Sequence, residues 1–146
     1  MKDIHSALTR VVSIAAAAYA ADNTPVAVDR RGHEAVEILL DIGAGGITFS
    51  GSNKIEFKLT HSEDDSTYSD VTDADMLGGQ TVASGGIIKS LVAAHAAAAV
   101  YRYGYKGNKR YLKLLADFTG THGTATPIAA SILLGHGDRR PEAAQA

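Results

Sequence analysis

The stretch KIEFKLTHSEDDSTYSDV, residues 54–71, decides the fold of this chain. Apolar residues occupy alternate positions from Ile55 to Leu59, which is the period-two pattern of a strand with one face on a core. The Asp- and Ser-rich run at residues 61–66 has no apolar side chain to bury, and these residue types satisfy backbone groups in turns. Residues 67–71 then return to side chains that favour strands. The stretch therefore predicts a β-hairpin with an acidic tip.

The same alternation predicts further strands on both sides of this hairpin. Gly-rich and Asn-containing turn signals separate them, and the last turn before residue 110 predicts a second hairpin with the strand that follows. Seven to eight short strands spaced in this way predict an all-β fold, either an antiparallel β-sandwich or a jelly-roll-like barrel. The additional strands are expected at residues 9–14, with Val12 and Ile14 on one face, and at residues 26–28, 35–42, 101–105, 110–118 and 126–134.

Residues 87–100 are ambiguous. Their alanines have the highest helix propensity, whereas the glycines before them and the tyrosines after them belong to β structure. The pattern therefore predicts either one short helix or an irregular excursion.

A length of 146 residues favours a single domain. We expect an N-terminal arm over residues 1–21, a β-sandwich over 22–136 and a C-terminal surface tail over 137–146. The arm is expected to be ordered only where something holds it. The apolar part of the arm, residues 11–21, is short and interrupted, which predicts a mature, soluble chain rather than a signal peptide.

Composition excludes several function classes. A net charge of −2 and a pI near 6.3 give no electrostatic basis for a nucleic-acid or anionic-membrane partner. The chain has no cysteine, which excludes disulfides, thiolate zinc sites and cysteine nucleophiles. We therefore expect neither a nucleic-acid partner nor a membrane partner.

The side chains that could carry chemistry form no recognised motif. The carboxylates of Glu63–Asp75 could supply oxygen ligands to calcium, but the spacing is not that of an EF-hand, so a solvated hairpin tip is the favoured interpretation. No GxSxG elbow, P-loop or paired-histidine motif is present, so we expect no enzyme, no metal site and no cofactor. The six histidines are scattered singly, at His5, His33, His61, His95, His122 and His136.

Three tyrosines alternate with cations in the strand expected at 101–105. Tyr101, Tyr103 and Tyr105 could stack a sugar or a base, but tyrosine is also a preferred strand residue, and packing against the sandwich is the favoured interpretation. The pairs Arg30-Arg31 and Arg139-Arg140 are expected to be solvated or to contact an acidic partner protein.

Several segments together resemble a group of small virion proteins of tailed bacteriophages. The shared patterns are a Ser-rich acidic turn after a strand, xxSxDxSTxxxV, and a later GYxGxKRY, which stand here at Thr60–Val71 and Gly104–Tyr111. The resemblance covers residues 26–141. It departs from the group at Asp65-Ser66, where Asp-Gly is common, and in the alanine-rich insertion at residues 91–99.

The resemblance implies a β-sandwich that binds the outside of a capsid or its connector. On that basis we expect a non-enzymatic capsid decoration, or cement, protein on the outer surface of the virion head. It would self-associate, with a trimer among the expected states, and bridge subunits of the major capsid protein. An extended arm can add a strand to a neighbouring sheet, so deleting residues 1–12 is expected to abolish capsid binding and leave a folded monomer. The candidate partner-binding residues are Ile4, Leu8, Arg10, Val12, Arg30, Arg31, Tyr103, Arg139 and Arg140.

Two other functions remain open. A head–tail connector or minor tail component would differ from a cement protein mainly in copy number. A carbohydrate-binding β-sandwich module would use the three tyrosines of residues 101–105 as a platform.

Overall fold

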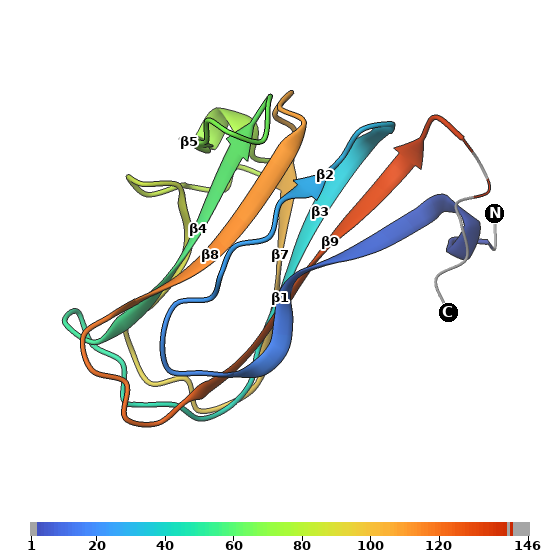
Figure 1. The fold of residues 1–146 in the computed structure, drawn as a ribbon. Coiled ribbons are helices and arrows are strands. Elements are labelled where there is room, and N and C mark those ends of the chain that lie inside the picture. The colour runs from blue at the N-terminus through green and yellow to red at the C-terminus, as the bar shows by residue number, and fades with distance from the viewer. Residues whose placement is uncertain (1–2, 140, 142–146) are drawn as a thin grey trace.

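The computed structural model describes residues 3–139 and residue 141, and this part of the chain forms a two-layer β-sandwich (Figure 1). The predicted all-β fold is confirmed as a sandwich rather than a closed barrel. The strands are β1 (Leu8–Tyr19), β2 (Val28–Asp29), β3 (His33–Ile42), β4 (Lys54–Ser62), β5 (Ser69–Asp70), β6 (Ile87–Leu91), β7 (Ala99–Tyr105), β8 (Tyr111–Thr119) and β9 (Thr126–Gly137). Two short 3₁₀ turns complete the elements, η1 (His5–Ala7) and η2 (Asp73–Asp75).

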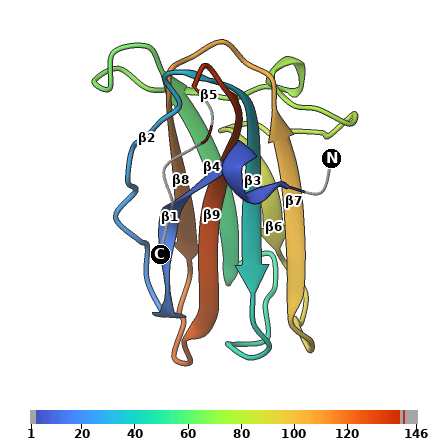
Figure 2. The same ribbon diagram turned by 90° about the vertical axis from the view of Figure 1, so that its right-hand side faces the viewer.

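The strands divide into two antiparallel sheets. Sheet A has the order β1-β9-β3-β7, and Figure 2 shows these four strands side by side. Sheet B has the order β2-β8-β4-β5, with β6 also paired to β4. β4 therefore lies at the centre of sheet B, as expected for the stretch that decides the fold.

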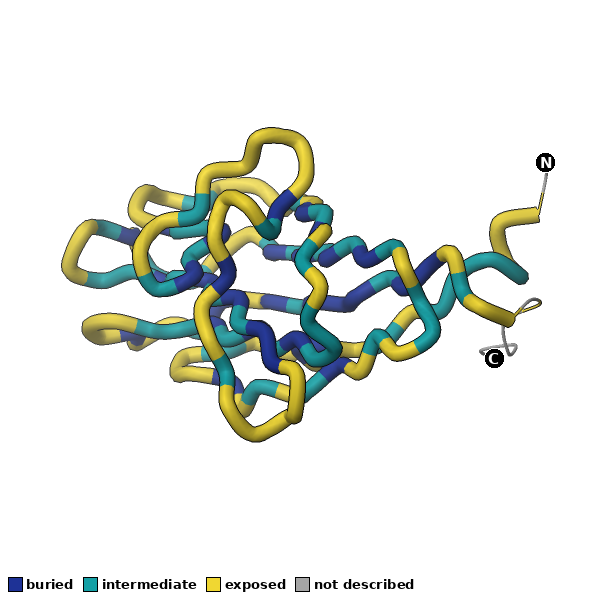
Figure 3. Tube along the Cα trace, turned by 90° about the horizontal axis from the view of Figure 1, so that it is seen from above, coloured by how far each residue is buried: buried dark blue, intermediate teal, exposed yellow. Residues whose placement is uncertain are grey.

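Alternating apolar residues build the core between the sheets. In β4, Ile55, Phe57 and Leu59 have no exposed surface, and the predicted inward residues of β3 are also buried. The predicted alternation in β8 and β9 is confirmed as well, since both strands bury every second apolar residue up to Ala116 and from Ile128 to Leu134. Figure 3 shows buried positions along the strands and exposed positions at the loops.

The predicted second hairpin is wrong. β7 pairs with β3 in sheet A, with Ile38 opposite Tyr103, whereas β8 pairs with β4 in sheet B, with Leu59 opposite Leu114. The turn at residues 106–110 therefore carries the chain from one sheet to the other. Strands adjacent in sequence usually neighbour each other, but the alternation of each strand satisfies either sheet equally well.

The segment 87–100 contains no helix. Ile87–Leu91 forms β6, residues 92–98 form a loop, and β7 begins at Ala99. The backbone of Glu56 and Phe57 in β4 offers β6 a pairing edge, opposite Ser90 and Lys89. Tertiary pairing therefore overrides the helix propensity of the alanines.

Most of the segment expected as an N-terminal arm is a strand of the sandwich. β1 pairs with β9 from Leu8 opposite Gly135 to Tyr19 opposite Thr126. A register shift inserts one residue between Val12 and Ile14, so Val12 points outward while Ile14 is buried, and the two do not share a face as predicted. Of the described residues, only 3–7 remain outside β1 as an arm.

The hairpin predicted at residues 54–71 and the strand predicted at residues 26–28 are both present, but their strands are shorter than expected. The acidic hairpin exists, but its second strand is only β5, which pairs with Thr60 and His61. Similarly, β2 covers only two residues, and Val26 lies outside it with more than half of its surface exposed. In the expected tail, β9 extends to Gly137, and Arg140 and residues 142–146 lie outside the described residues.

Candidate functional site

The outer face of sheet B is charged and internally paired. Lys54 Nζ lies 2.6 Å from Glu56 Oε1, and Lys58 pairs with Asp117 on the neighbouring strand. Lys113 lies 3.7 Å from Asp65 and above the ring of Tyr68. Exposed charges that pair with one another remain hydrated, so this face is suited to contact with solvent.

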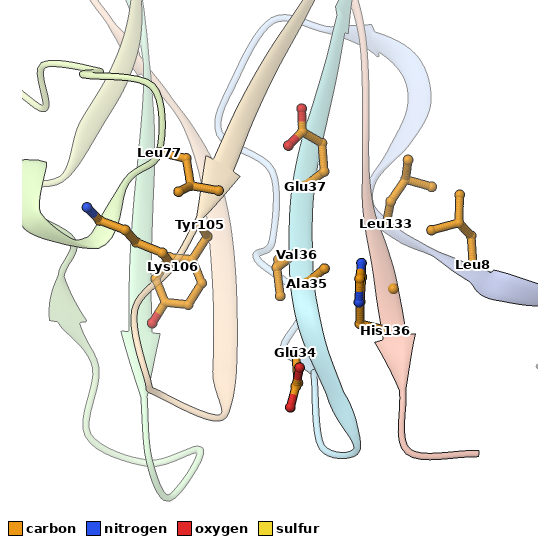
Figure 4. Close-up of a pocket in the computed structure, with 11 residues that line it drawn as sticks. Leu8, Glu34, Ala35, Val36, Glu37, Leu77, Tyr105, Lys106, Leu133 and His136 are labelled. Carbon is orange, nitrogen blue, oxygen red and sulfur yellow. The ribbon is translucent and has the colours of Figure 1, made fainter. Parts of the chain in front are cut away.

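The outer face of sheet A, in contrast, carries an apolar trough of about 570 Å³ (Figure 4). Leu8 and Leu133 form one wall, and Leu77, half exposed in the loop after η2, forms the other. The Leu77 backbone N–H donates to Gly104 O at 2.8 Å, which holds this loop against the edge of β7. The full lining is Leu8, Glu34, Ala35, Val36, Glu37, Leu77, Tyr105, Lys106, Leu133, Gly135 and His136.

Gly135 leaves room for Leu8 at the edge of this trough. A Cβ at this position would lie 2.9 Å from Leu8 Cδ2 and 3.7 Å from the Cβ of Ala35. A side chain at position 135 would therefore push the end of Leu8 away from its present place across β9. Polar side chains stand at the rim: Glu34 and Glu37 lie at opposite ends of the trough on β3, Lys106 lies on the side of β7 and His136 on the side of β9 (Figure 4). Glu37 also pairs with Arg102 at 3.5 Å.

The predicted partner-binding residues of the N-terminal segment fall into two groups. Leu8, Arg10 and Val12 share the outer face of β1, where Arg10 Nε donates to Ser131 Oγ at 2.8 Å. Ile4 precedes the strand and is 69% exposed, the highest value among the large apolar residues described as exposed. Its segment lies away from the body of the sandwich (Figures 1 and 3).

The arginine pairs play different parts. Arg30 Nε donates to Lys109 O at 2.8 Å, and its guanidinium lies 5.8 Å from the centroid of the Tyr105 ring, so it fastens the turn between β7 and β8. Arg31 and Arg139 come together around a second hollow, because Asp138 N–H donates to Gly32 O at 2.8 Å. Arg140 lies outside the described residues.

The tyrosines do not form an exposed platform. Tyr103 is 6% exposed and Tyr105 is 1% exposed, so both face the core, as the favoured interpretation predicted. Burial raises the pKa of Tyr103 to about 12. Tyr101 is partly buried under Lys89, whose Nζ lies 4.2 Å from the ring centroid. Tyr103 is therefore not available to a partner.

The acidic tip uses its carboxylates to hold its own turn. Asp64 Oδ1 accepts the backbone N–H groups of Ser66 and Thr67, both at 2.9 Å, and these bonds lower the pKa of Asp64. Asp65 has a φ of 58° and accepts a hydrogen bond from the Tyr68 hydroxyl. Within the described part of the chain, no group of three or more His, Asp or Glu side chains gathers in a way that could hold a metal ion.

Sequence reasoning missed one surface, the uncharged end of the sandwich. Four segments distant in sequence meet there, and both views show them together at the lower end (Figures 1 and 2). Gly43 N–H donates to Pro127 O at 2.8 Å, and a His95 ring nitrogen lies 3.2 Å from Gly43 O. We define the uncharged end as residues 15–21, 43–53, 92–98 and 120–127. None of the residues in these four ranges is Asp, Glu, Lys or Arg, although those types make up 21% of the chain.

Much of the uncharged end is exposed. The alanines of residues 15–18 and 96–98 are all exposed, as are Val92 and Pro127. The opposite end carries charges in its loops, including Arg31, Asp64 and Lys109. Charged residues border the uncharged end, since exposed Asp22 follows Ala21 and Asp41 lines a hollow with Ala16, Ala17 and Pro127. The loops of this end are nevertheless less charged than those of the opposite end, which only the folded chain reveals.

No family model, curated protein or solved structure matches this chain. Among the described residues, no helix is long and apolar enough to cross a membrane.

Proposed function

We propose that this chain is a non-enzymatic virion structural protein that binds the outer surface of a tailed-phage head as a decoration, or cement, protein. It would contact the major capsid protein and copies of itself, and bridge neighbouring capsid subunits. The resemblance at Thr60–Val71 and Gly104–Tyr111 motivates this proposal. A cement protein needs a rigid scaffold with an adhesive surface, and repetition over a lattice multiplies a modest affinity.

The observation that carries the proposal is the uncharged end. Surfaces that remain in water usually carry many charges, whereas the centres of protein interfaces are depleted of them. Exposed Val92 and the alanines of residues 96–98 would lose little by leaving water, because these side chains carry no polar group that must give up its hydration. We therefore propose that the uncharged end docks on the capsid shell.

The head–tail connector remains the nearest alternative, since it would use the same kind of surface with a different copy number. The carbohydrate module is not favoured by any observation. Its expected platform requires exposed rings, and Tyr103 and Tyr105 are buried.

The test is to mix the purified protein with capsids that lack it, and to locate and count the bound copies by electron microscopy. Many copies at the lattice axes would support the cement role, with the uncharged end against the shell. A single ring at one vertex would support the connector instead, and no binding would overturn both.

A pair of matched variants tests the docking surface. Ala97→Glu puts a charge on an exposed residue of the uncharged end and is expected to abolish shell binding. Ala74→Glu makes the same change on an exposed residue of η2 at the charged end, and is expected to bind like the unmodified chain. Equal binding of the two variants would contradict docking through the uncharged end.

A further inference from the structure

We propose that the protein self-associates by inserting Ile4 of one copy into the apolar trough of a second copy. This assignment specifies the self-association in the proposed function, but it does not depend on a capsid and is tested on the isolated chain. Three observations carry it: an exposed apolar side chain on a projecting segment, an open apolar trough, and matching charges around both.

The projecting segment is short and internally ordered. Asp3 accepts hydrogen bonds from the backbone N–H and the hydroxyl of Ser6, so the residues before β1 form a compact turn. This turn, which leads into η1, buries none of its own residues. Ile4 is thus presented on a preorganised turn, which reduces the entropy lost when it binds.

The trough is suited to receive such a side chain. Its apolar walls, Leu8, Leu133 and Leu77, come from β1, β9 and the loop after η2 (Figure 4). The trough of the same chain does not hold Ile4, because Ile4 is 69% exposed. In Figure 1 the first half of β1 bends away from the body of the sandwich, which carries the arm outward over this face of sheet A.

The polar groups that flank Ile4 and those at the rim of the trough are complementary. In the sequence, Asp3 and His5 flank Ile4, one an acid and the other an imidazole that can donate a hydrogen bond. Across the trough, Lys106 stands on the side of β7, and Glu34 and Glu37 stand on β3. An inserted Ile4 can therefore bring Asp3 towards Lys106 and His5 towards one of the two glutamates. This arrangement of opposite charges favours a second copy of this chain as the occupant.

Such a contact joins two different surfaces of the same chain. It closes as a reciprocal pair if two copies exchange arms, and as a ring if each copy passes its arm to the next. Both forms contain the same contact of Ile4 with the trough.

Sedimentation equilibrium of the full chain provides the first test. The unmodified chain is expected to be oligomeric, and Ile4→Asp and Leu77→Asp are each expected to weaken association by about tenfold or more, because each puts a charge into an apolar contact. Val26→Asp changes an apolar residue that is about as exposed as Leu77, 53% against 50%, and does not line the trough, so this variant is expected to associate normally. A monomeric unmodified chain, or an Ile4→Asp variant that associates normally, would overturn the proposal.

Mixing provides a test that a folding defect cannot imitate. The Ile4→Asp chain keeps an intact trough and the Leu77→Asp chain keeps an intact arm, so the mixture is expected to form hetero-oligomers that neither variant forms alone. Absence of mixed species would contradict the contact.

Cross-linking identifies the two residues directly, because the natural chain has no cysteine. In the Ile4→Cys/Leu77→Cys variant, an added oxidant is expected to link separate chains, as a denaturing gel would show by mass. The Ile4→Cys/Val26→Cys variant is the matched control and should not give the same yield. A link formed within one chain would mean that the arm folds over its own trough, and would overturn the proposal.

Discussion

At the scale of single residues, the side chain of Asn23 makes backbone hydrogen bonds to β8 where β2 is too short to make them. β2 pairs with β8 only at Leu112 and Tyr111. Beyond it, the side chain of Asn23 pairs with the same strand: Oδ1 accepts the N–H of Ala116 at 2.7 Å, and Nδ2 donates to Leu114 O at 3.3 Å. Asn23 thus satisfies two backbone groups on the open edge of sheet B and fixes the segment that crosses from sheet A.

Asn23→Ala should therefore lower the free energy of unfolding by about 2–4 kcal/mol, because two buried backbone groups lose their partners. Asp22→Ala is the control. Asp22 accepts a single backbone N–H, from Phe118, at an exposed position where water can replace it. Urea denaturation of the three proteins checks this, and an Asn23→Ala variant within about 0.5 kcal/mol of the unmodified chain would contradict it.

His61 makes stability depend on pH. Its Nδ1 lies 2.9 Å from the Tyr105 hydroxyl, and burial lowers the pKa of His61, with Asp75 opposing the shift and Lys109 adding to it. The unfolded chain therefore binds the proton more readily, so the free energy of unfolding should fall as the pH decreases below about 6.5 and level off below the folded-state pKa.

Denaturation between about pH 7.5 and pH 5 measures this dependence, above the range where carboxylates begin to titrate. His61→Asn keeps a polar atom near the position of Nδ1 and should flatten the curve. An unaltered slope in His61→Asn would show that another group carries the dependence.

At the scale of elements, alternation predicted the strands well and their partners poorly. β3, β4, β8 and β9 could be predicted because each buries every second residue in a two-layer fold. The pairing of β7 with β3 could not, since an amphipathic strand fits either sheet until the other strands are placed. The outward turn of Val12 was equally unpredictable, because a bulge at Ser13 leaves no mark in the pattern.

The pairing of β1 changes how the N-terminal segment should be truncated. Deleting residues 1–7 removes η1, which buries nothing within its own chain, and should leave the stability of the folded monomer unchanged when it is compared with the Ile4→Asp chain, which also lacks the proposed arm contact. Deleting residues 1–12 also removes the strand residues opposite Gly135 to Ser131, including half-buried Val11, and should cost about 2–4 kcal/mol of stability. Thermal unfolding of both truncations checks this, and equal melting temperatures would contradict it. The shorter truncation therefore tests the arm without damaging sheet A.

At the scale of the whole molecule, the candidate surfaces arise from residues that the sequence keeps apart. Each segment of the uncharged end is an ordinary glycine- or alanine-rich stretch on its own, and only the sandwich brings residues 43–53 beside 92–98 and 120–127. The trough likewise combines Leu8, Leu77 and Leu133. Sequence analysis singled out Ile4 and Leu8 as parts of an arm that could add a strand to a neighbouring sheet, whereas no local pattern marks a surface that is defined by missing charges.

The polarity of the molecule predicts how shell binding should respond to salt. Salt screens contacts between exposed charges, but it does not weaken the burial of uncharged surface. If the uncharged end carries the contact, affinity for capsids should change by less than about threefold between about 50 and 500 mM NaCl.

If the hollow beside Arg31 and Arg139 carried it instead, affinity would fall steeply with salt and Arg31→Glu would abolish binding. Titration of labelled protein onto capsids at both salt concentrations, with Arg31→Glu alongside Ala97→Glu, separates the two. A salt-sensitive interaction that Arg31→Glu abolishes would move the docking surface to the opposite end of the sandwich.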